Sequence, residues 1–526
     1  MIRSIVKRAV WAPHHATLAG LSFIALATGP LNAAPLGSGQ RDAATVTTIP
    51  PLTIGDEPVI VTHHHIETAH GALTYQANAG RLAIRSEETG EIRGYIFFVS
   101  YSVPSTGAPR PITFAWNGGP LIASAIIHME GFGPRRRTNA GMVDNAETLL
   151  QTSDLVFLDP VETGFSRPAK PEFAPDFMNM QGDVRATVEF IRAYRAEFRS
   201  RQQPLFIAGE SYGVFRAAAV ADMLTARHEP LAGTILVSGG IPNIPEPTAF
   251  YDAWHIPGRT ATAIHYNRLD AGLMRDPQHT MQEVRDWVQS TYLPALEHLD
   301  QLDEGHRDTI ASQLALYTGM RPEQIDRKTL VVTANHFLND FLSLDGTKQM
   351  TEEDTRLLVG QEGDDLGSAS LVDSYIRGEL GYRTSLVYEG LEPGYTPTPG
   401  PRKRTMRDQW DYNQPGVTSA DLSDMMQSGE VTPLARHNPT WILNALHQQP
   451  DMQLFVAAGR YDPLNMCEGD AAEVASLSSD LQSRIETHCY DSGHIIYRDD
   501  KARAVFLHDV AQFIERTTTK QRATQH

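Results

Sequence analysis

The sequence predicts an α/β fold with a mostly parallel central sheet that is flanked by helices on both faces. Two observations lead to this prediction. Short, continuous apolar runs recur along the chain, which is typical of strands buried on both faces of a parallel sheet. Between them, apolar residues recur at helical spacing, as in residues 184–198. The apolar runs are Ile112–Ala115, Leu155–Leu158, Leu205–Ala208, Thr234–Val237 and Leu454–Ala457.

An interruption of this alternation indicates the domain organisation. Ala72–Arg85 and Arg93–Val103 have the pattern of antiparallel strands and precede the parallel ones. The alternation stops after Gly240 and resumes near Trp441, so we expect a largely helical cap inserted after the strand near 234–240. The expected parts are a first core segment over 59–244, the cap over 245–435, a second core segment over 436–516 and a polar tail over 517–526.

The N-terminal residues have the pattern of an export signal. Basic side chains within residues 1–8 precede the apolar stretch Leu18–Ala27, which is too short to cross a bilayer as a helix. The small residues Ala33–Ala34 follow. We therefore expect a signal peptide over 1–34, a flexible leader over 35–58, and a periplasmic or secreted protein without stable membrane insertion. An uncleaved anchor is the alternative.

The composition excludes several classes of protein. The 526 residues are 41% hydrophobic and 21% charged, as in a packed globular protein. The net charge of −18 argues against a nucleic-acid partner, because phosphate binding needs a basic surface. In an oxidising compartment we expect the two cysteines, Cys467 and Cys489, to pair; two buried free thiols are the alternative.

Ser211 lies in the only GxSxG sequence of the chain, at Gly209–Gly213. This motif follows the strand run Leu205–Ala208 and precedes a helix expected over Phe215–Leu224. Such a strand–turn–helix setting is that of a nucleophile elbow, in which the two glycines permit a sharp turn. The sequence therefore predicts the α/β-hydrolase fold with Ser211 as the nucleophile.

A serine nucleophile needs a base and an orienting carboxylate, which follow it along the chain in this fold. Asp462 comes just after the run Leu454–Ala457, and His494 comes after the last strand-like segment. Loops at the carboxyl ends of parallel strands are where such sheets place active sites. We expect Asp462 and His494 to complete a triad. A turn-forming aspartate before Pro463 and a surface histidine are the alternatives, with Asp491 as the second choice of carboxylate.

The segment Trp116–Pro120 supplies candidate donors for an oxyanion hole. It follows the run Ile112–Ala115 and contains two adjacent glycines, which expose backbone N–H groups. Acyl transfer needs such donors, and the N–H after the nucleophile, that of Tyr212, is the usual second one. A plain turn is the alternative interpretation.

Together these motifs resemble the serine carboxypeptidases, peptidase family S10, and especially their bacterial branch, over nearly the whole mature chain. The resemblance implies that Ser211, Asp462 and His494 are the catalytic triad. It also implies that Gly119 and Tyr212 donate to the oxyanion. The matching segments are Trp116–Pro120, Gly131–Pro134, Asp154–Ser166, Gly209–Gly213, Gly459–Asp462 and Gly493–His494.

The same resemblance implies that Asn117, Gly118 and Glu210 bind the free carboxylate at the end of a peptide. A carboxylate beside a substrate carboxylate is unfavourable unless the two share a proton, so Glu210 should be protonated when substrate is bound. We therefore expect an exported serine carboxypeptidase that favours acid pH and needs no metal or organic cofactor. An esterase, amidase or acyltransferase acting on a carboxylate-bearing small molecule is the alternative. A third possibility is a non-catalytic binding protein on a hydrolase scaffold.

Two residues depart from the family's pattern. Leu121 stands where a glycine usually follows Gly-Gly-Pro, and Glu162 also stands where a glycine is usual. If the first position requires a positive φ, Leu121 is strained there; otherwise its side chain narrows the cleft. Glu162 is expected either to be solvated or to alter the substrate site.

Other conspicuous residues receive ordinary interpretations. The histidines His63–His65 and His70 suggest a metal site, but alternate residues of a strand face opposite ways and no carboxylate set completes it. His128 is expected to be a packed histidine, with a position lining the cleft as the alternative. Arg135–Arg137 is expected to be a solvated turn, with contact to an anionic substrate as the alternative.

Overall fold

The computed structural model describes residues 58–242, 248–343, 348–360, 369–391, 410–411 and 440–524. The expected signal peptide over 1–34, nearly all of the expected leader and part of the expected cap lie outside the described residues. None of the helices in the described ranges is long and apolar enough to cross a bilayer.

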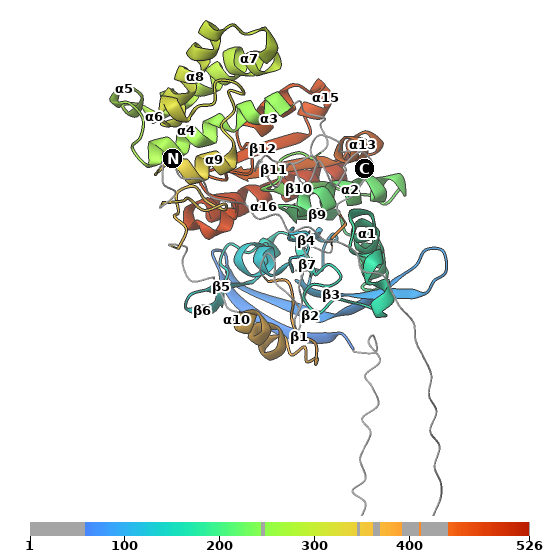
Figure 1. The fold of residues 1–526 in the computed structure, drawn as a ribbon. Helices are drawn as coiled ribbons and strands as arrows, with labels where there is room; N and C mark the ends of the chain where they lie inside the picture. The colour runs from blue at the N-terminus through green and yellow to red at the C-terminus, as the bar shows by residue number, and fades with distance from the viewer. Residues whose placement is uncertain are drawn as a thin grey trace, which may run out of the picture. The chain divides into compact units, whose positions relative to one another are not determined.

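A mostly parallel sheet forms the centre of the fold (Figure 1). Its strands are β1 (Ile60–Thr68), β2 (Gly71–Arg85), β3 (Ile92–Ser102), β4 (Ile112–Trp116), β7 (Asp154–Leu158), β8 (Arg167–Pro168), β9 (Leu205–Glu210), β10 (Gly233–Val237), β11 (Gln453–Gly459) and β12 (Ile485–Tyr490). They follow the order β1-β2-β3-β7-β4-β9-β10-β11-β12, with β8 paired to β3. In this order, adjacent strands from β7 through β4 to β12 are parallel. The strands β1, β2 and β3 pair antiparallel, and β3 also pairs antiparallel with β7. This is the arrangement of an α/β-hydrolase, which confirms the predicted fold.

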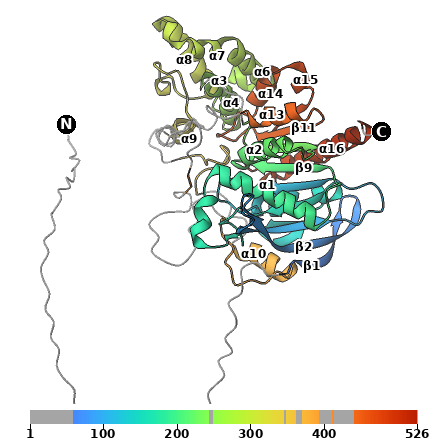
Figure 2. The ribbon, with the colours of Figure 1, turned by 90° about the vertical axis from the view of Figure 1, so that its right-hand side faces the viewer.

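Helices cover both faces of the sheet, as Figures 1 and 2 show. One face packs on α1 (Met180–Glu197), α2 (Gly213–Ala226) and α13 (Trp441–Gln448), and the other on α16 (Asp500–Thr524). Successive residues of β9 enter different cores: Phe206 packs with Phe513 of α16, and Ile207 belongs to the cluster around Val220 of α2. The continuous apolar runs are therefore explained by burial on both sides.

A helical insertion follows β10, as predicted, and has an apolar core of its own around Tyr292, Leu314 and Phe337. Residues 369–391 lie within the range expected for the cap, yet Val372 and Tyr375 pack on the sheet face that α16 covers. The insertion contains α3 (Thr248–Trp254), α4 (Ile256–His265), α5 (Ala271–Met274), α6 (Pro277–Trp287), α7 (Leu293–Glu297), α8 (Glu304–Thr318) and α9 (Ala334–Asp340). The remaining elements named in Figure 1 are β5 (Arg135–Thr138), β6 (Gly141–Asp144), α10 (Ala369–Ser374) and α15 (Ser479–Gln482), and α14 spans Gly469–Ala475.

Candidate active site

Ser211 stands at the sharp turn between β9 and α2. Its φ of 57° lies in the left-handed region, and its N–H donates to the carbonyl of Val237 at 2.9 Å. A Cβ atom on Gly209 would lie 2.0 Å from the carbonyl oxygen of Gly213, a separation that non-bonded atoms cannot adopt. The turn therefore needs a glycine at this position and has the strained geometry of a nucleophile elbow.

Asp462 and His494 are in direct contact. Oδ2 of Asp462 lies 2.7 Å from Nδ1 of His494, and the same carboxylate accepts from the Leu464 N–H at 2.9 Å and the Asn465 amide at 2.5 Å. Burial lowers the pKa of His494, but the Asp462 carboxylate outweighs that effect and raises it to about 9. The carboxylate thus orients the ring and stabilises its protonated form.

The loop that carries His494 also contacts the residue that follows β10 and the inserted region. The Ser238 hydroxyl donates to the carbonyl of His494 at 2.5 Å, and the His494 N–H donates to the carbonyl of Glu353 at 2.6 Å. A Cβ on Gly493 would lie 2.4 Å from that Glu353 oxygen, so the preceding residue must be glycine. Within the described residues, the Ser211 hydroxyl makes no hydrogen bond to the imidazole.

The Gly-Gly loop after β4 lies directly on the elbow. A Cβ on Gly118 would be 2.5 Å from the backbone nitrogen of Tyr212, and Gly119 has a φ of 108°. The two expected oxyanion donors, the N–H groups of Gly119 and Tyr212, therefore belong to backbone segments in contact. This close approach is possible only because residue 118 has no side chain.

A buried ion pair fixes this loop, and sequence reasoning did not find it. Arg216 of α2 is fully buried and donates to Asp183 of α1 at 2.7 Å. Its other nitrogens donate to the carbonyls of Asn117 at 2.8 Å and Pro120 at 3.2 Å. Arg216 is the one charged residue in the apolar stretch 213–221, which is the signal that could have found it.

Glu210 and Asn117 form a buried pair beside the nucleophile. Oε2 of Glu210 accepts from Nδ2 of Asn117 at 2.7 Å and from the Tyr497 hydroxyl. Oδ1 of Asn117 accepts from the Ile127 N–H at 2.9 Å, which fixes the orientation of the amide. Burial raises the pKa of Glu210 to about 7, although the hydrogen bond from Tyr497 opposes the shift. Sequence reasoning did not find Tyr497.

A second buried carboxylate lies near this pair and corrects one prediction. Glu130 accepts from Nε of Arg137 at 2.8 Å and from Nε of Arg498 at 2.9 Å, and its charge also raises the pKa of Glu210. Arg137 was expected in a solvated turn, but that expectation is wrong because its side chain points inward from β5 and is 4% exposed. Arg498 also donates to Glu353 at 2.6 Å.

The two departures from the family's pattern differ in conformation. Leu121 has no positive φ, so the strain considered for it is absent. Glu162 has a φ of 73°, in the left-handed region that favours glycine, and its side chain is half-buried. The structure therefore explains why a glycine suits position 162.

Cys467 and Cys489 form a disulfide, with their Cα atoms 5.3 Å apart. The bridge joins the segment after Asp462 to the last strand before His494. Asp491, the second choice of carboxylate, forms an ion pair with Arg460. Asp462 is therefore the carboxylate that contacts the histidine.

Two of the other histidines singled out in the sequence, His128 and His64, have structural partners. His128 is buried against Tyr101, with 2.7 Å between Nε2 and the hydroxyl, and burial lowers its pKa to about 3. His64 bonds to the Thr62 hydroxyl at 2.7 Å and stacks on Tyr75. Over the described ranges, no group of three or more His, Cys, Asp or Glu side chains is arranged to hold a metal ion.

Comparison with known proteins finds a family to which part of the chain is similar. Residues 72–238 match the sequence pattern of the serine carboxypeptidases, peptidase S10, and this span includes Asn117, Glu210 and Ser211. A search of curated protein sequences found no match.

The solved structures compared here are similar to this chain in fold but distant in sequence. They include a proline iminopeptidase from Mycobacterium smegmatis, at 11% identity and TM-score 0.33 over 84% of this chain and 100% of that one. An esterase from Thermogutta terrifontis aligns at 12% identity and TM-score 0.32, over 84% of this chain and 99% of that one. A haloalkane dehalogenase from Bradyrhizobium elkanii aligns at 10% identity and TM-score 0.34, over 88% of this chain and 99% of that one. The fold assignment depends on the strand order of this chain. The sequence match is limited to residues 72–238, which are similar to the serine carboxypeptidases, peptidase S10.

Proposed function

We propose that this protein is an exported serine carboxypeptidase that releases C-terminal amino acids from peptides through an acyl-enzyme on Ser211. The observation that supports it most is the buried Asn117–Glu210 pair directly before the nucleophile. A neutral amide and a carboxyl with a pKa near 7 suit a substrate's terminal carboxylate, because they offer hydrogen bonds without a permanent like charge.

The proposed reaction assigns one role to each group. The Ser211 oxygen attacks the last peptide carbonyl while Nε2 of His494 takes the hydroxyl proton. The N–H groups of Gly119 and Tyr212 stabilise the oxyanion, and Asp462 stabilises the imidazolium. His494 then passes the proton to the nitrogen of the leaving amino acid as the C–N bond breaks. Water, deprotonated by His494, hydrolyses the ester and restores Ser211.

The two titrating groups act in opposite directions with pH. A neutral His494 is needed for any substrate, and its raised pKa makes hydrolysis increase with pH. A protonated Glu210 is needed only for substrates with a terminal carboxylate, and this protonated form is lost as pH rises through about 7. The preference for free-acid peptides over amidated ones should therefore be greatest at acid pH.

The experiment is a pH series of release from blocked dipeptides with free or amidated C-termini, using wild type and Ser211→Ala. Release from the free acids, with a preference that is strongest at acid pH and with activity lost in Ser211→Ala, supports the proposal. No release from either set, with Ser211 still labelled by a fluorophosphonate, would refute it and favour the esterase, amidase or acyltransferase alternative. Absence of labelling as well would favour a binding protein.

Export is the part of the proposal that concerns the cell. It is supported by the pattern of residues 1–34 and by the disulfide, since such bonds persist in oxidising compartments. Mass spectrometry of the protein from periplasmic and culture fractions tests it. A protein that retains residues 1–34 in the cytoplasmic fraction would contradict export.

A further inference from the structure

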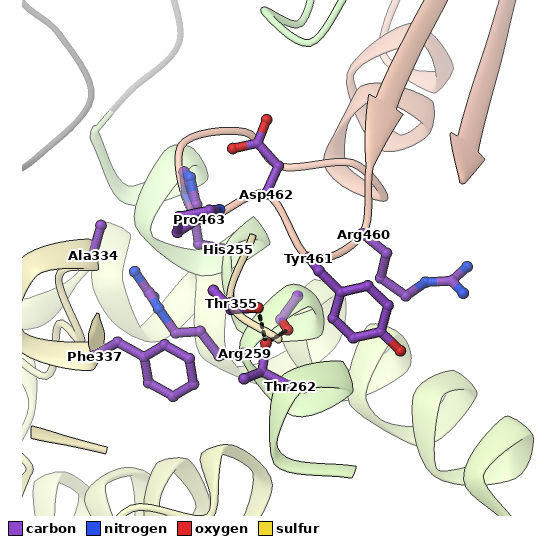
Figure 3. A pocket seen from close by; sticks show the side chains of 11 residues that line it. His255, Arg259, Thr262, Ala334, Phe337, Thr355, Arg460, Tyr461, Asp462 and Pro463 are labelled. Carbon is purple, nitrogen blue, oxygen red and sulfur yellow. Dashed lines mark hydrogen bonds between the residues drawn. The ribbon is translucent and has the colours of Figure 1, made fainter. Parts of the chain in front are cut away.

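A small cavity lies behind the loop that carries Asp462, between this loop, α4 and α9 (Figure 3). Its empty space of about 260 Å³ includes the opening to solvent. The residues used below are His255, Arg259, Thr262, Phe337, Thr355 and Asp462, all of which line it. Asp462 is the one lining residue that has a role in the reaction proposed above.

Arg259 is the unusual residue of the cavity. It is only 7% exposed, yet no described residue accepts a hydrogen bond from its guanidinium or forms an ion pair with it, and its Nη1 is buried without a partner. Its contact with the Phe337 ring is loose, with 5.9 Å to the centroid. Burial lowers the pKa of Arg259 to about 10, and electrostatic interactions with Tyr292 and Asp252 oppose the shift. A buried cation without an anionic partner is strongly unfavourable, so this group favours an added anion.

The other charges around the cavity are already compensated or neutral. Asp462 is bonded to His494, and in Figure 3 its carboxylate points away from Arg259. Arg460 bonds to Glu468 at 3.1 Å. Nδ1 of His255 bonds to the carbonyl of Tyr251 at 2.7 Å, and burial lowers its pKa to about 4. One unmatched positive charge, that of Arg259, therefore faces the cavity.

We propose that this cavity binds one small inorganic anion, of halide size, as the ion-pair partner of Arg259. The hydroxyls of Thr262 and Thr355, 2.6 Å apart, line the same space, and the Thr262 hydroxyl also donates to the carbonyl of Gly258 at 3.0 Å. The narrow space excludes a peptide chain. The binding does not depend on the catalytic proposal, because the anion takes no part in the reaction.

An anion here would hold the inserted helices on the loop of Asp462. A Cβ on Gly258 would lie 3.1 Å from the carbonyl of Arg460, so α4 lies close to this loop. The Thr355 N–H donates to the carbonyl of Tyr461 at 2.9 Å. Because residues from both sides of this boundary line the cavity, binding of the anion should raise the stability of the folded protein.

The first test measures thermal unfolding of the purified full chain as chloride replaces gluconate at constant ionic strength. We expect the Tm of wild type to rise by about 1–3 °C when chloride is about tenfold above its Kd. Arg259→Met should abolish the chloride dependence, whereas Arg259→Lys should retain part of it. Arg268→Met is the matched control in the insertion, since Arg268 packs on Phe341 and does not line the cavity; it should keep the full chloride effect.

The second test needs no variant. Crystals of wild type grown in sodium bromide should show an anomalous peak about 3–4 Å from the Arg259 guanidinium. Ordered water alone at that position would overturn the proposal. An equal chloride dependence in wild type and in folded Arg259→Met would also overturn it.

Discussion

Glu210→Gln is the substitution that most directly tests how the terminal carboxylate is recognised. Glutamine keeps the shape and the contact with Asn117 but cannot release a proton. In wild type, a pKa of about 7 leaves nearly all Glu210 protonated at pH 5 and about one tenth at pH 8. The ratio of kcat/KM for free-acid over amidated peptides should therefore fall about tenfold between pH 5 and 8. In Glu210→Gln that ratio should stay constant.

This ratio isolates Glu210 because both classes of substrate need a neutral His494, whose titration cancels. Stability provides an independent measurement of the same group. The folded-state pKa of Glu210, about 7, exceeds the ordinary 4.5, so the unfolded chain releases this proton first and wild type loses stability as pH rises from 4.5 to 7. The unfolding free energy of Glu210→Gln, relative to that of wild type, should increase by about 3 kcal/mol over that interval.

Asp470→Asn is the matched control. Asp470 on α14 is 1% exposed, and burial raises its pKa to about 8, so this variant should also gain stability at high pH. Its ratio of kcat/KM should fall with pH as in wild type. A ratio that still falls tenfold in Glu210→Gln would refute the role given to Glu210, even if the stability change is observed.

Three further predictions concern the groups around the nucleophile. Asp462→Asn should lower kcat by about 10³–10⁴-fold and bring the pKa of His494, read by NMR, down from about 9; an unchanged pKa would contradict their coupling. In Arg216→Lys, the lysine cannot bond to Asp183 and both loop carbonyls together, so kcat should fall by about 10–100-fold with a smaller change in KM. A loss of stability without a change in kcat would mean that Arg216 has a purely structural role. Cys467→Ser opens a loop of 22 residues and should cost about 3 kcal/mol of unfolding free energy in denaturant titration, an effect that reducing agent should reproduce in wild type but not in the variant.

The residues that could be predicted from the sequence are those with a local signature. Ser211 has two flanking glycines, and Asp462 and His494 follow strands that are recognisable by their apolar runs. Tyr497 has no such signature, because its hydroxyl reaches Glu210 only after the short helix Ile496–Arg498 packs beside the end of β9. Glu353 contacts the His494 loop through its backbone carbonyl, which any residue type could supply. Sequence patterns therefore find residues needed for local geometry and miss partners set by tertiary packing.

The main-chain hydrogen bond between Glu353 and His494 joins the inserted region to the loop after β12. Residues 353–354 lie so close to Gly493 that a single methyl group would not fit between them. Any displacement of residues 353–354 away from Gly493 must break the hydrogen bond from the His494 N–H to the Glu353 carbonyl. A substitution that moves this segment would therefore also shift the backbone of His494, whose side chain contacts Asp462.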